Sequence, residues 1–370
     1  MSIPDSEARV AFDELTATLQ EVADRYCGSE WGLAAPNDVA GALRVAAHLL
    51  EGGLVGHFED NPRQPVFRQI VTSTRKSMGD NADAIYHDTA VSPDLSYRVT
   101  GCTAGAVYVS FTIEAGGEDG AFPKRTAGVL NDAQFDVGPD GRFDVFIGGS
   151  PRGANWIGLV DGATRVTSRH YFEREVSPAV PPVPDVQLSI EALGGPHVLP
   201  PPTDASVAAG FRRVARYVRT RSLEQPKPGE AEQPPFVSRE INVFPPPVPP
   251  GDHALAASDA AYSMAPYVLG PEEALLMTAR WPVCRCANVS LWNRHLQTYD
   301  YAHRRVSLNR AQTMAAADGT FQIVLAHRDP GLPNWLDTEG RPFGLVFWRY
   351  MLPEGPIETP QARVVKLSDL

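Results

Sequence analysis

Two stretches of the chain repeat one another, and this duplication constrains the fold more than any other feature of the sequence. Residues 130–143 read LNDAQFDVGPDGRF and residues 308–321 read LNRAQTMAAADGTF, with seven of fourteen positions identical and no gap. The register continues, with one inserted residue, through Asn155-Trp156 and Asn334-Trp335 to Tyr171 and Tyr350. The copies start about 180 residues apart, which is too far for a solenoid unit and typical of whole domains. The repeat therefore predicts a duplicated β domain.

The residue types at the repeated positions predict structural roles for them. Asp140-Gly141 and Asp318-Gly319 are the pair favoured in tight hairpin turns, where both central residues take positive φ. In Asn155-Trp156 and Asn334-Trp335, we expect the Asn side chain to bond backbone groups while the Trp closes the end of the core.

Chain length and apolar patterning predict how the rest is organised. A length of 370 residues indicates two domains, and the totals of Pro 34 and Gly 31 favour many turns and short strands. Apolar residues alternate or run together at 97–99, 107–113 and 143–147, which predicts strands. Helical spacing predicts a helix over 12–26, a second from Pro36 to a glycine stop at 52–53, and a third from about residue 203.

The region between the two copies has two unusual features. Its helix carries Arg212, Arg213, Arg216, Arg219 and Arg221, which indicates either a salt-bridged surface or a site for an anion or an acidic partner. Residues 226–250 contain nine prolines, which predicts an extended connector or an ordered strap on the surface.

Composition excludes several classes of partner. A net charge of −11 argues against nucleic acid and against an anionic membrane surface. No stretch reaches the ~20 apolar residues of a membrane helix, and the first residues show no secretory signal. Four cysteines are too few for a disulfide scaffold. We therefore expect a cytoplasmic protein that binds neither nucleic acid nor membrane.

The motifs of the second copy resemble those of the domain-of-unknown-function family 1214. They read DGTFQIVL at 318–325, PNWL at 333–336 and FWRY at 347–350. The first copy, with Asn155-Trp156 and RHYF at 169–172, is similar to the same module, and NADAIY at 81–86 is similar to its opening segment. The resemblance implies two tandem jelly-roll-like β-sandwich domains and supplies no catalytic residues.

Candidate chemistry in the first copy centres on two histidines. His87 is followed by Asp88 at a strand end, and Arg169, His170 and Tyr171 alternate along another strand. If His87 and His170 faced one cavity with Asp88, they would form a general acid/base pair, with Arg169 binding substrate. The alternative is that each histidine is an ordinary core or surface residue.

The second copy is richer in polar candidates. Period two along a strand would place His295 and Tyr299 on one face, and His303 and Arg305 on one face. We predict that such a face binds a polar or anionic small molecule, while the alternative is an arginine-rich domain interface. The catalytic candidates are His295, His303, His327 and Asp329, and the binding candidates are Arg304, Arg328, Tyr299, Trp292 and Trp348.

No metal or cofactor is predicted. Cys284 and Cys286 have one residue between them, whereas structural zinc sites use two to four. The histidines at 295, 303 and 327 lack His-x-His spacing, and the sequence has no phosphate-binding loop, dinucleotide fingerprint or nucleophile elbow.

These observations predict a mainly β fold of two tandem jelly-roll-like β-sandwich domains. The expected divisions are an N-terminal helical hairpin at 1–58, the first sandwich at 59–193, a helix and proline-rich connector at 194–251, and the second sandwich at 252–370. The predicted function is an enzyme that acts on a small polar or anionic metabolite by acid/base chemistry, as a hydrolase or lyase, with its site in the second repeat or between repeats. The alternative is a non-catalytic carbohydrate-binding or assembly-forming protein, and a homo-oligomer is expected in both cases.

Overall fold

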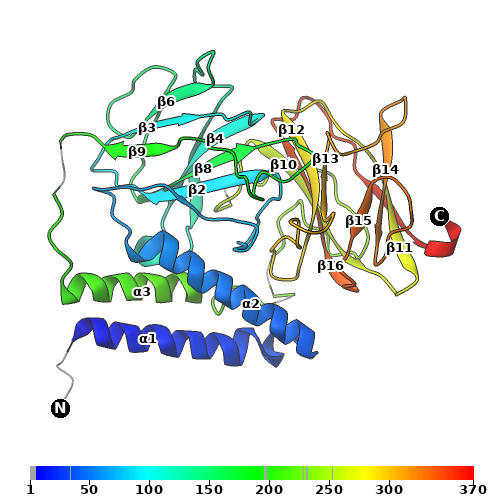
Figure 1. Ribbon diagram of the computed structural model, residues 1–370, viewed down its shortest axis with the longest axis horizontal. Helices are drawn as coiled ribbons and strands as arrows, with labels where there is room; N and C mark the ends of the chain where they lie inside the picture. The colour runs from blue at the N-terminus through cyan, green and yellow to red at the C-terminus, as the bar shows by residue number, and fades with distance from the viewer. Residues whose placement is uncertain (1–5, 34, 196–197, 228, 231, 252) are drawn as a thin grey trace.

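The computed structural model describes residues 6–33, 35–195, 198–227, 229–230, 232–251 and 253–370. It holds three α-helices and four β-sheets, arranged as a helical layer beside two β-sandwiches (Figure 1). The mainly β fold class, the N-terminal helical hairpin and the two β-sandwich halves predicted from the sequence are therefore confirmed.

The first β-sandwich consists of two sheets, which we name A and B. Sheet A has the strand order β1-β2-β8-β4-β5 and sheet B the order β7-β6-β3-β9. Val109, Phe111 and Ile113 of sheet A pack against Val99 and Val145 of sheet B to form the core. The strands are β1 (Arg68–Gln69), β2 (Ala84–Ala90), β3 (Tyr97–Cys102), β4 (Tyr108–Ala115), β5 (Arg125–Asn131), β6 (Arg142–Ile147), β7 (Trp156–Ile157), β8 (Ala163–Tyr171) and β9 (Ser189–Ala192).

The second β-sandwich repeats this plan with sheets C and D. Sheet C has the order β10-β16-β12-β13 and sheet D the order β15-β14-β11-β17. Val289, Val346 and Trp348 of sheet C pack against Leu275 and Ile323 of sheet D. The strands are β10 (Ala260–Val268), β11 (Glu273–Arg280), β12 (Cys286–Trp292), β13 (Ser307–Asn309), β14 (Thr320–Ala326), β15 (Trp335–Asp337), β16 (Phe343–Met351) and β17 (Gln361–Lys366).

The strand orders of the two sandwiches correspond strand by strand, from β2 with β10 to β9 with β17. Ala84 pairs with Tyr171 in the first sandwich, and Ala260 pairs with Met351 in the second. Tyr171 therefore corresponds to Met351 and not to Tyr350, so the sequence register was wrong by one residue in this strand. The same correspondence places Arg169 opposite Tyr86 and Arg349 opposite Tyr262.

Side chains at the repeated positions hold turns and loops in both sandwiches. Asn155 Nδ2 donates to the carbonyls of Asp136 and Asp144, and Asn334 Nδ2 donates to those of Met314 and Gln322. The Asp-Gly turns differ from the expectation, because only the glycine of each pair is left-handed, with φ of 81° at Gly141 and 84° at Gly319. The aspartates instead accept a backbone N–H two residues onward.

The helical layer covers one end of the first sandwich (Figure 1). It contains α1 (Glu7–Glu21), α2 (Pro36–Gly53) and α3 (Asp204–Thr220). Short π-helical segments, η1 (Val22–Tyr26) and η3 (Leu54–Phe58), extend α1 and α2, and 3-10 segments lie at η2 (Ser29–Trp31), η4 (Glu118–Gly120) and η5 (Leu367–Asp369). By length and composition alone, Pro36–Phe58 could cross a bilayer, which the sequence analysis did not anticipate, and core helices of folded proteins pass the same test.

The expected end of the second helix at 52–53 is confirmed, because α2 ends at Gly53, but no left-handed glycine ends it. Both glycines are helical, and a Cβ on Gly53 would lie 3.1 Å from Val214 and 3.2 Å from Tyr217 of α3. Glycine at position 53 therefore allows α2 and α3 to approach closely, and the chain continues from it into the π-helical η3.

The proline-rich segment runs along the second sandwich. Val248 bridges to Tyr262 and Val237 bridges to Met264, both on β10. Prolines suit this position because the segment pairs at an edge, where a missing N–H is tolerated. The described part of the segment is thus an ordered strap.

Candidate functional site

The structure does not bring the histidines of the second copy together. His295 is buried and its Nδ1 lies 2.8 Å from the Tyr26 hydroxyl, whereas the His303 side chain is 80% exposed beside Asp300. His327 is half-buried and bonds Thr338 Oγ1 and the Leu269 carbonyl. Period two was the wrong pattern here, because residues 293–304 form turns between β12 and β13 and not a strand.

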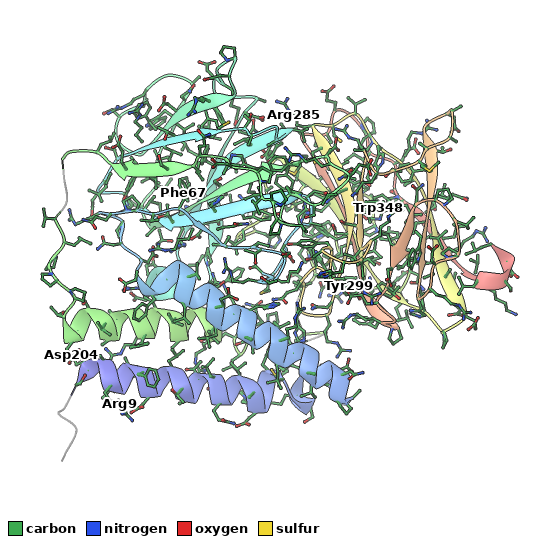
Figure 2. The ribbon with its side chains drawn as sticks, viewed as in Figure 1. Arg9, Phe67, Asp204, Arg285, Tyr299 and Trp348 are labelled. Atoms are coloured by element: carbon green, nitrogen blue, oxygen red, sulfur yellow. The ribbon has the colours of Figure 1, made fainter. Side chains whose placement is uncertain are left out.

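The other candidates of the second copy are also dispersed. Arg304 pairs with Asp337 at 2.7 Å, Arg328 pairs with Glu272, and Asp329 accepts the Gly331 N–H. Trp348 and Tyr299 belong to the interior of the second sandwich (Figure 2). Trp292 faces the first sandwich instead and stacks on Phe347 with 4.3 Å between ring centroids. The candidate residues of the second copy therefore do not share one pocket.

His87 and His170 face the interior of the first sandwich, away from Asp88. His170 is fully buried, and burial lowers its pKa to about 3, while burial lowers the pKa of His87 to about 4. Asp88 follows His87 in β2, so it points to the opposite face of sheet A. The expected cavity shared by both histidines and Asp88 is therefore wrong.

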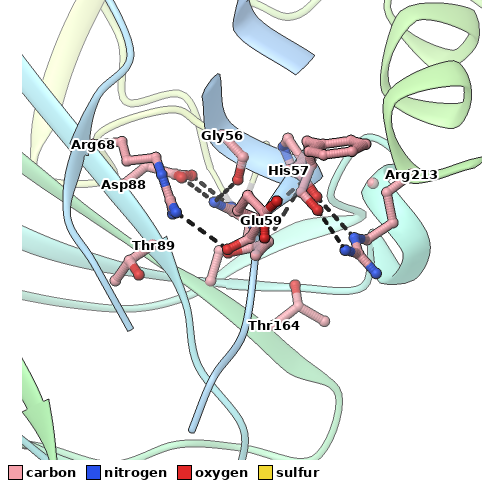
Figure 3. Close-up of polar contacts among 12 residues, drawn as sticks. Gly56, His57, Glu59, Arg68, Asp88, Thr89, Thr164 and Arg213 are labelled. Atoms are coloured by element: carbon pink, nitrogen blue, oxygen red, sulfur yellow. Dashed lines mark hydrogen bonds and ion pairs between the residues drawn. The ribbon is translucent and has the colours of Figure 1, made fainter. Parts of the chain in front are cut away.

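Asp88 belongs to an ion-pair cluster where sheet A meets the helical layer (Figure 3). Arg165 donates to both oxygens of Asp88, to Asp60 and to the Gly56 carbonyl. All three charged side chains are buried. Two carboxylates share one guanidinium, which indicates a structural cluster that anchors η3 to the sheet.

The outer faces of sheets A and C pack against one another, and we call this contact the A–C interface. Tyr86, Tyr108 and Tyr171 of sheet A meet Tyr262 and Phe347 of sheet C within one apolar cluster. Ligand sites occur preferentially at such interfaces between domains. Polar side chains of both sheets also point into this contact.

Glu114 and Arg169 are the charged pair that sheet A contributes. Glu114 is 0% exposed, and its Oε1 lies 4.0 Å from Arg169 Nη2 without a hydrogen-bond partner among the described residues. Burial raises the pKa of Glu114, and the Arg169 charge offsets part of that shift. Arg169 donates to Thr112 Oγ1 and, at 2.9 Å, to the Leu255 carbonyl.

Arg349 is the corresponding arginine of sheet C. It is 4% exposed, and its Nη2 donates to the Gly79 carbonyl at 3.3 Å. Within the described part of the chain, its Nε and Nη1 have no hydrogen-bond partner and no carboxylate lies within 4.0 Å. The guanidinium carbon lies 4.8 Å from the Phe347 ring centroid. A buried guanidinium with two unused donors is costly unless something accepts from it.

Asp80 and Asp83 are the two carboxylates whose pKa values the Arg349 charge affects, and both are already bonded to neutral groups. Asp80 accepts from Thr298 N and Oγ1, and Asp83 accepts from Asn288 Nδ2 and Asn309 Nδ2. Burial raises the pKa of both, to about 6 for Asp83. Their oxygens are thus committed elsewhere, and Arg349 retains unpaired donors.

Two arginines and three tyrosines line the centre of the A–C interface, and we call them, with Glu114, the interface site. Tyr86 and Tyr171 place their hydroxyl oxygens 3.3 Å apart, and the Tyr262 hydroxyl accepts the Ala257 N–H at 3.1 Å. Burial raises the pKa of Tyr262 to about 12 and that of Tyr86 well above its usual value, so these phenols remain proton donors. The interface site comprises Tyr86, Glu114, Arg169, Tyr171, Tyr262 and Arg349.

Two crossed pairs fix the sandwiches around this site. Asn131 of the first sandwich donates to Asp259 at 2.8 Å, and Asn309 of the second donates to Asp83 at 2.8 Å. Both asparagines belong to the sequence repeat, and the aspartates directly precede the corresponding strands β2 (Asp83) and β10 (Asp259). The repeated asparagines therefore hold the two sandwiches to one another.

Residues 253–257 cover the charged pair of sheet A. The Leu255 N–H donates to Glu114 Oε2 at 3.3 Å, and its carbonyl accepts from Arg169. Leu255 has a φ of 63°, a conformation that a leucine rarely adopts. Leu255 is therefore held in this conformation by Glu114 and Arg169, two members of the interface site.

The arginines of α3 are engaged within the molecule. Arg212 pairs with Glu14, Arg216 pairs with Glu224, and Arg213 donates to the His57 carbonyl (Figure 3). A hollow of about 800 Å³ runs beside them, lined also by Phe122 and Lys124. The salt-bridged surface, one of the two readings that the sequence left open, describes this helix.

Sequence reasoning named Arg169 as a binding residue and noted Tyr171 beside it, but it assigned no site role to Glu114, Tyr86, Tyr262 or Arg349. Tyr108, Ser110, Thr112 and Glu114 alternate with apolar residues along β4, a pattern that usually marks a face exposed to water. The signal that could have found them is Glu114 on β4, because the neighbouring strand β8 carries Arg165 and Arg169.

Among the described residues, no group of three or more His, Cys, Asp or Glu side chains is placed to hold a metal ion. Cys286 lies in the A–C interface, and Cys284 Sγ donates to its carbonyl at 3.5 Å.

Comparison with solved structures identifies relatives over the whole chain. An uncharacterized protein from Burkholderia cenocepacia is 25% identical, with a TM-score of 0.83 over 97% of this chain and 98% of that chain. The VPA0106 protein from Vibrio parahaemolyticus is 10% identical, with a TM-score of 0.51 over 98% of both chains, which shows the fold alone. None of the curated proteins matches this sequence.

One family matches part of the chain, over residues 276–354, and its description is protein of unknown function (DUF1214). The matched residues run from β11 to just past β16. One copy is matched, and a second copy is supported only in part, by the two-domain structure with its shared strand order. The match to DUF1214 therefore lies within the second β-sandwich of this chain.

Proposed function

We propose that the chain binds a small anionic metabolite between its two β-sandwiches and acts on it by acid/base chemistry, as a hydrolase or a lyase. The observation that carries the proposal is the buried Arg349, whose Nη2 donates to the Gly79 carbonyl while Nε and Nη1 have no hydrogen-bond partner among the described residues. Arginine binds carboxylate and phosphate oxygens through paired N–H groups, so an anion would satisfy both donors at once.

Each member of the interface site has a role in this proposal. Arg349 and Arg169 hold the anion from facing sheets, and both lie beside the same phenols. Glu114 transfers the proton, because it is the carboxyl group beside Arg169 and burial raises its pKa, which favours the protonated form more than in an exposed glutamate. The Tyr86 and Tyr171 hydroxyls donate hydrogen bonds to developing negative charge.

Access to Glu114 involves residues 253–257. A substrate that reaches the carboxylate takes the place of the Leu255 N–H, which now donates to it at 3.3 Å. The left-handed conformation of Leu255 favours this exchange, because release of the segment relieves backbone strain of about 1–3 kcal/mol.

The test is a thermal-shift screen of the purified chain against phosphate, sulfate, small mono- and dicarboxylates, and sugar phosphates. A ligand at about 100 times its Kd stabilises the folded state by about 2.7 kcal/mol. We expect one class of anion to raise Tm, and Arg349→Met to abolish the rise. Arg328→Met is the matched control, because Arg328 is an exposed arginine of the same sandwich paired with Glu272.

Glu114→Gln separates catalysis from binding. The amide keeps the size of the side chain and its contact with Leu255 but cannot exchange a proton, so the variant should bind the anion and fail to turn it over. If no anion shifts Tm, or if Arg349→Met binds as well as the parent, the proposal is wrong. The non-catalytic alternative would then be tested by carbohydrate binding and by sedimentation, in which a homo-oligomer is expected.

A further inference from the structure

Lys76 differs from every other lysine of the chain. The sequence has 33 basic residues, of which only Lys76, Lys124, Lys227 and Lys366 are lysines. Lys76 is 2% exposed, whereas Lys124 and Lys366 are exposed and Lys227 is half-buried. Lysine is almost never fully buried unless it is paired. Nearly all basic residues of this chain are arginines, so the buried lysine indicates a role that arginine cannot fill. A lysine amine can lose its proton, whereas a guanidinium stays charged.

The Lys76 ammonium lacks a hydrogen-bond acceptor. Its Nζ is buried without a partner among the described residues and lies 3.0 Å from the centroid of the Tyr301 ring. The Tyr301 hydroxyl is also buried without a partner in that part of the chain. An amine and a phenol hydroxyl, both without a hydrogen-bond partner among the described residues, thus meet at the Tyr301 ring.

The charged groups around Lys76 do not compensate for its burial. The charges of Asp80, Asp300 and Glu339 raise the pKa of Lys76. The charge of Arg44 lowers it. Asp80 is bonded to Thr298 through both oxygens, and Asp300 is bonded to His303. Burial is the largest influence and lowers the pKa of Lys76 to about 8.

The site lies where three parts of the molecule meet. The backbone of Lys76 is held from two sides. Its amide nitrogen lies 3.4 Å from His48 Nδ1 of α2, and its carbonyl accepts from Gln297 Nε2 at 3.2 Å. Tyr301 and Gln297 belong to the turns of the second sandwich, while Lys76 precedes β2 of the first. The helical layer and both sandwiches therefore position one amine.

We propose that Lys76 is a nucleophilic amine that binds a small aldehyde or ketone as an imine. The neutral amine adds to the carbonyl carbon, forming a C–N bond while the carbonyl oxygen becomes a hydroxyl. The carbinolamine then loses water, whose two hydrogens come from the amine, and the C=N bond forms. Burial raises the pKa of Tyr301 and keeps its hydroxyl protonated, and because that hydroxyl has no partner among the described residues, we assign it the role of hydrogen-bond donor to the departing oxygen.

The test uses glyoxylate, a small aldehyde, with cyanoborohydride at pH 7.5, followed by peptide mapping by mass spectrometry. We expect Lys76 to be alkylated roughly tenfold faster than the three other lysines, because an amine of lowered pKa is far more deprotonated at this pH than an ordinary lysine of pKa about 10.4. Lys124 is the internal reference, since it is exposed in the same molecule.

Two variants make the outcome decisive. Tyr301→Phe keeps the ring under Nζ and removes the hydroxyl, so it should slow alkylation of Lys76 while Tm changes little. Lys76→Arg should remove the fast-reacting position and leave the other three unchanged. If Lys76 reacts no faster than Lys124 in the parent protein, or stays unmodified while the surface lysines react, the amine has only a structural role and the proposal is overturned.

Discussion

The outer faces of sheets A and C occupy corresponding positions in the two sandwiches, yet their chemistry differs. Strand β4 presents Glu114 where β12 presents Trp292, and β2 presents Asp88 where β10 presents Met264. The arginine of β8 and the arginine of β16 are retained, as are the tyrosines that pair with them. After duplication, the sandwiches thus share the cationic side of the interface, but Glu114 has no counterpart on β12. The carboxylate that the second sandwich supplies, Asp259, accepts from Asn131 and Tyr108 of the first.

This difference indicates how a duplicated fold can build an asymmetric site. Sheet C contributes mainly apolar cover, with Trp292, Phe347 and Met351 in the interface cluster. That cover removes water from Glu114 and Arg169, and burial strengthens every charge interaction that remains. In the proposed function, the first sandwich would supply the acid/base group, and the second would supply the enclosure together with one arginine.

The largest expected effect concerns the buried ion pairs of sheet A, compared with the exposed pairs of sheet B. Arg165→Met leaves Asp88 and Asp60 buried without their shared cation and should lower the free energy of unfolding by about 3–5 kcal/mol. Arg98→Met on sheet B is the matched control, because Arg98 pairs with Asp144 in solvent, and it should cost at most about 1 kcal/mol. Equal losses in urea denaturation would show that the outer face of sheet A is not a special environment.

The crossed asparagines sharpen the comparison between the sandwiches. Asn309→Ala removes a donor from the fully buried Asp83, whereas Asn131→Ala removes one from the less buried Asp259, which also accepts from Tyr108. We expect losses of about 2 and about 1 kcal/mol respectively in the free energy of unfolding. A larger loss for Asn131→Ala would contradict the view that burial sets the difference.

The smallest expected effect is a dependence on pH from a buried histidine of the first sandwich, at a position where the second sandwich has a tyrosine. His170 corresponds to Tyr350 of the second sandwich, and its folded-state pKa of about 3 lies below the ordinary histidine value of about 6.5. The unfolded chain therefore binds more protons between these values, so stability is full above pH 6.5 and falls as the pH drops toward 3. Denaturant titrations between pH 7 and 5 should show an average slope about 1 kcal/mol per pH unit smaller in His170→Gln than in the parent, because the unfolded histidine is only partly protonated over this range. An unchanged slope would mean that His170 is not held neutral by its burial.

Much of the fold could be predicted because the repeated residues have local structural causes. Asn334 bonds the carbonyls around it and Trp335 donates to the Ala326 carbonyl, so these residues form the same loop wherever the motif occurs. Local patterns also predicted the strands, since alternation is set by one neighbouring face.

The interface site could not be predicted because its burial depends on a contact between distant segments. Glu114 and Thr112 have the alternation of a solvent face, and only the packing of sheet C removes water from them. Conversely, the histidines at 295 and 303 are close in sequence but point to different surroundings, because the chain between them turns. Arg349 was quoted within the FWRY motif, but a one-residue error in register concealed its correspondence with Arg169.

The most direct test of the central claim is a crystal structure of the protein soaked in selenate, with the selenium located by anomalous scattering. Selenate is a tetrahedral oxyanion that mimics phosphate or sulfate. The account predicts an anomalous peak between sheets A and C, with selenate oxygens within hydrogen-bond distance of Arg349 Nε and Nη1. Peaks confined to other surfaces, with only water accepting from Arg349, would contradict an anion site between the two sandwiches.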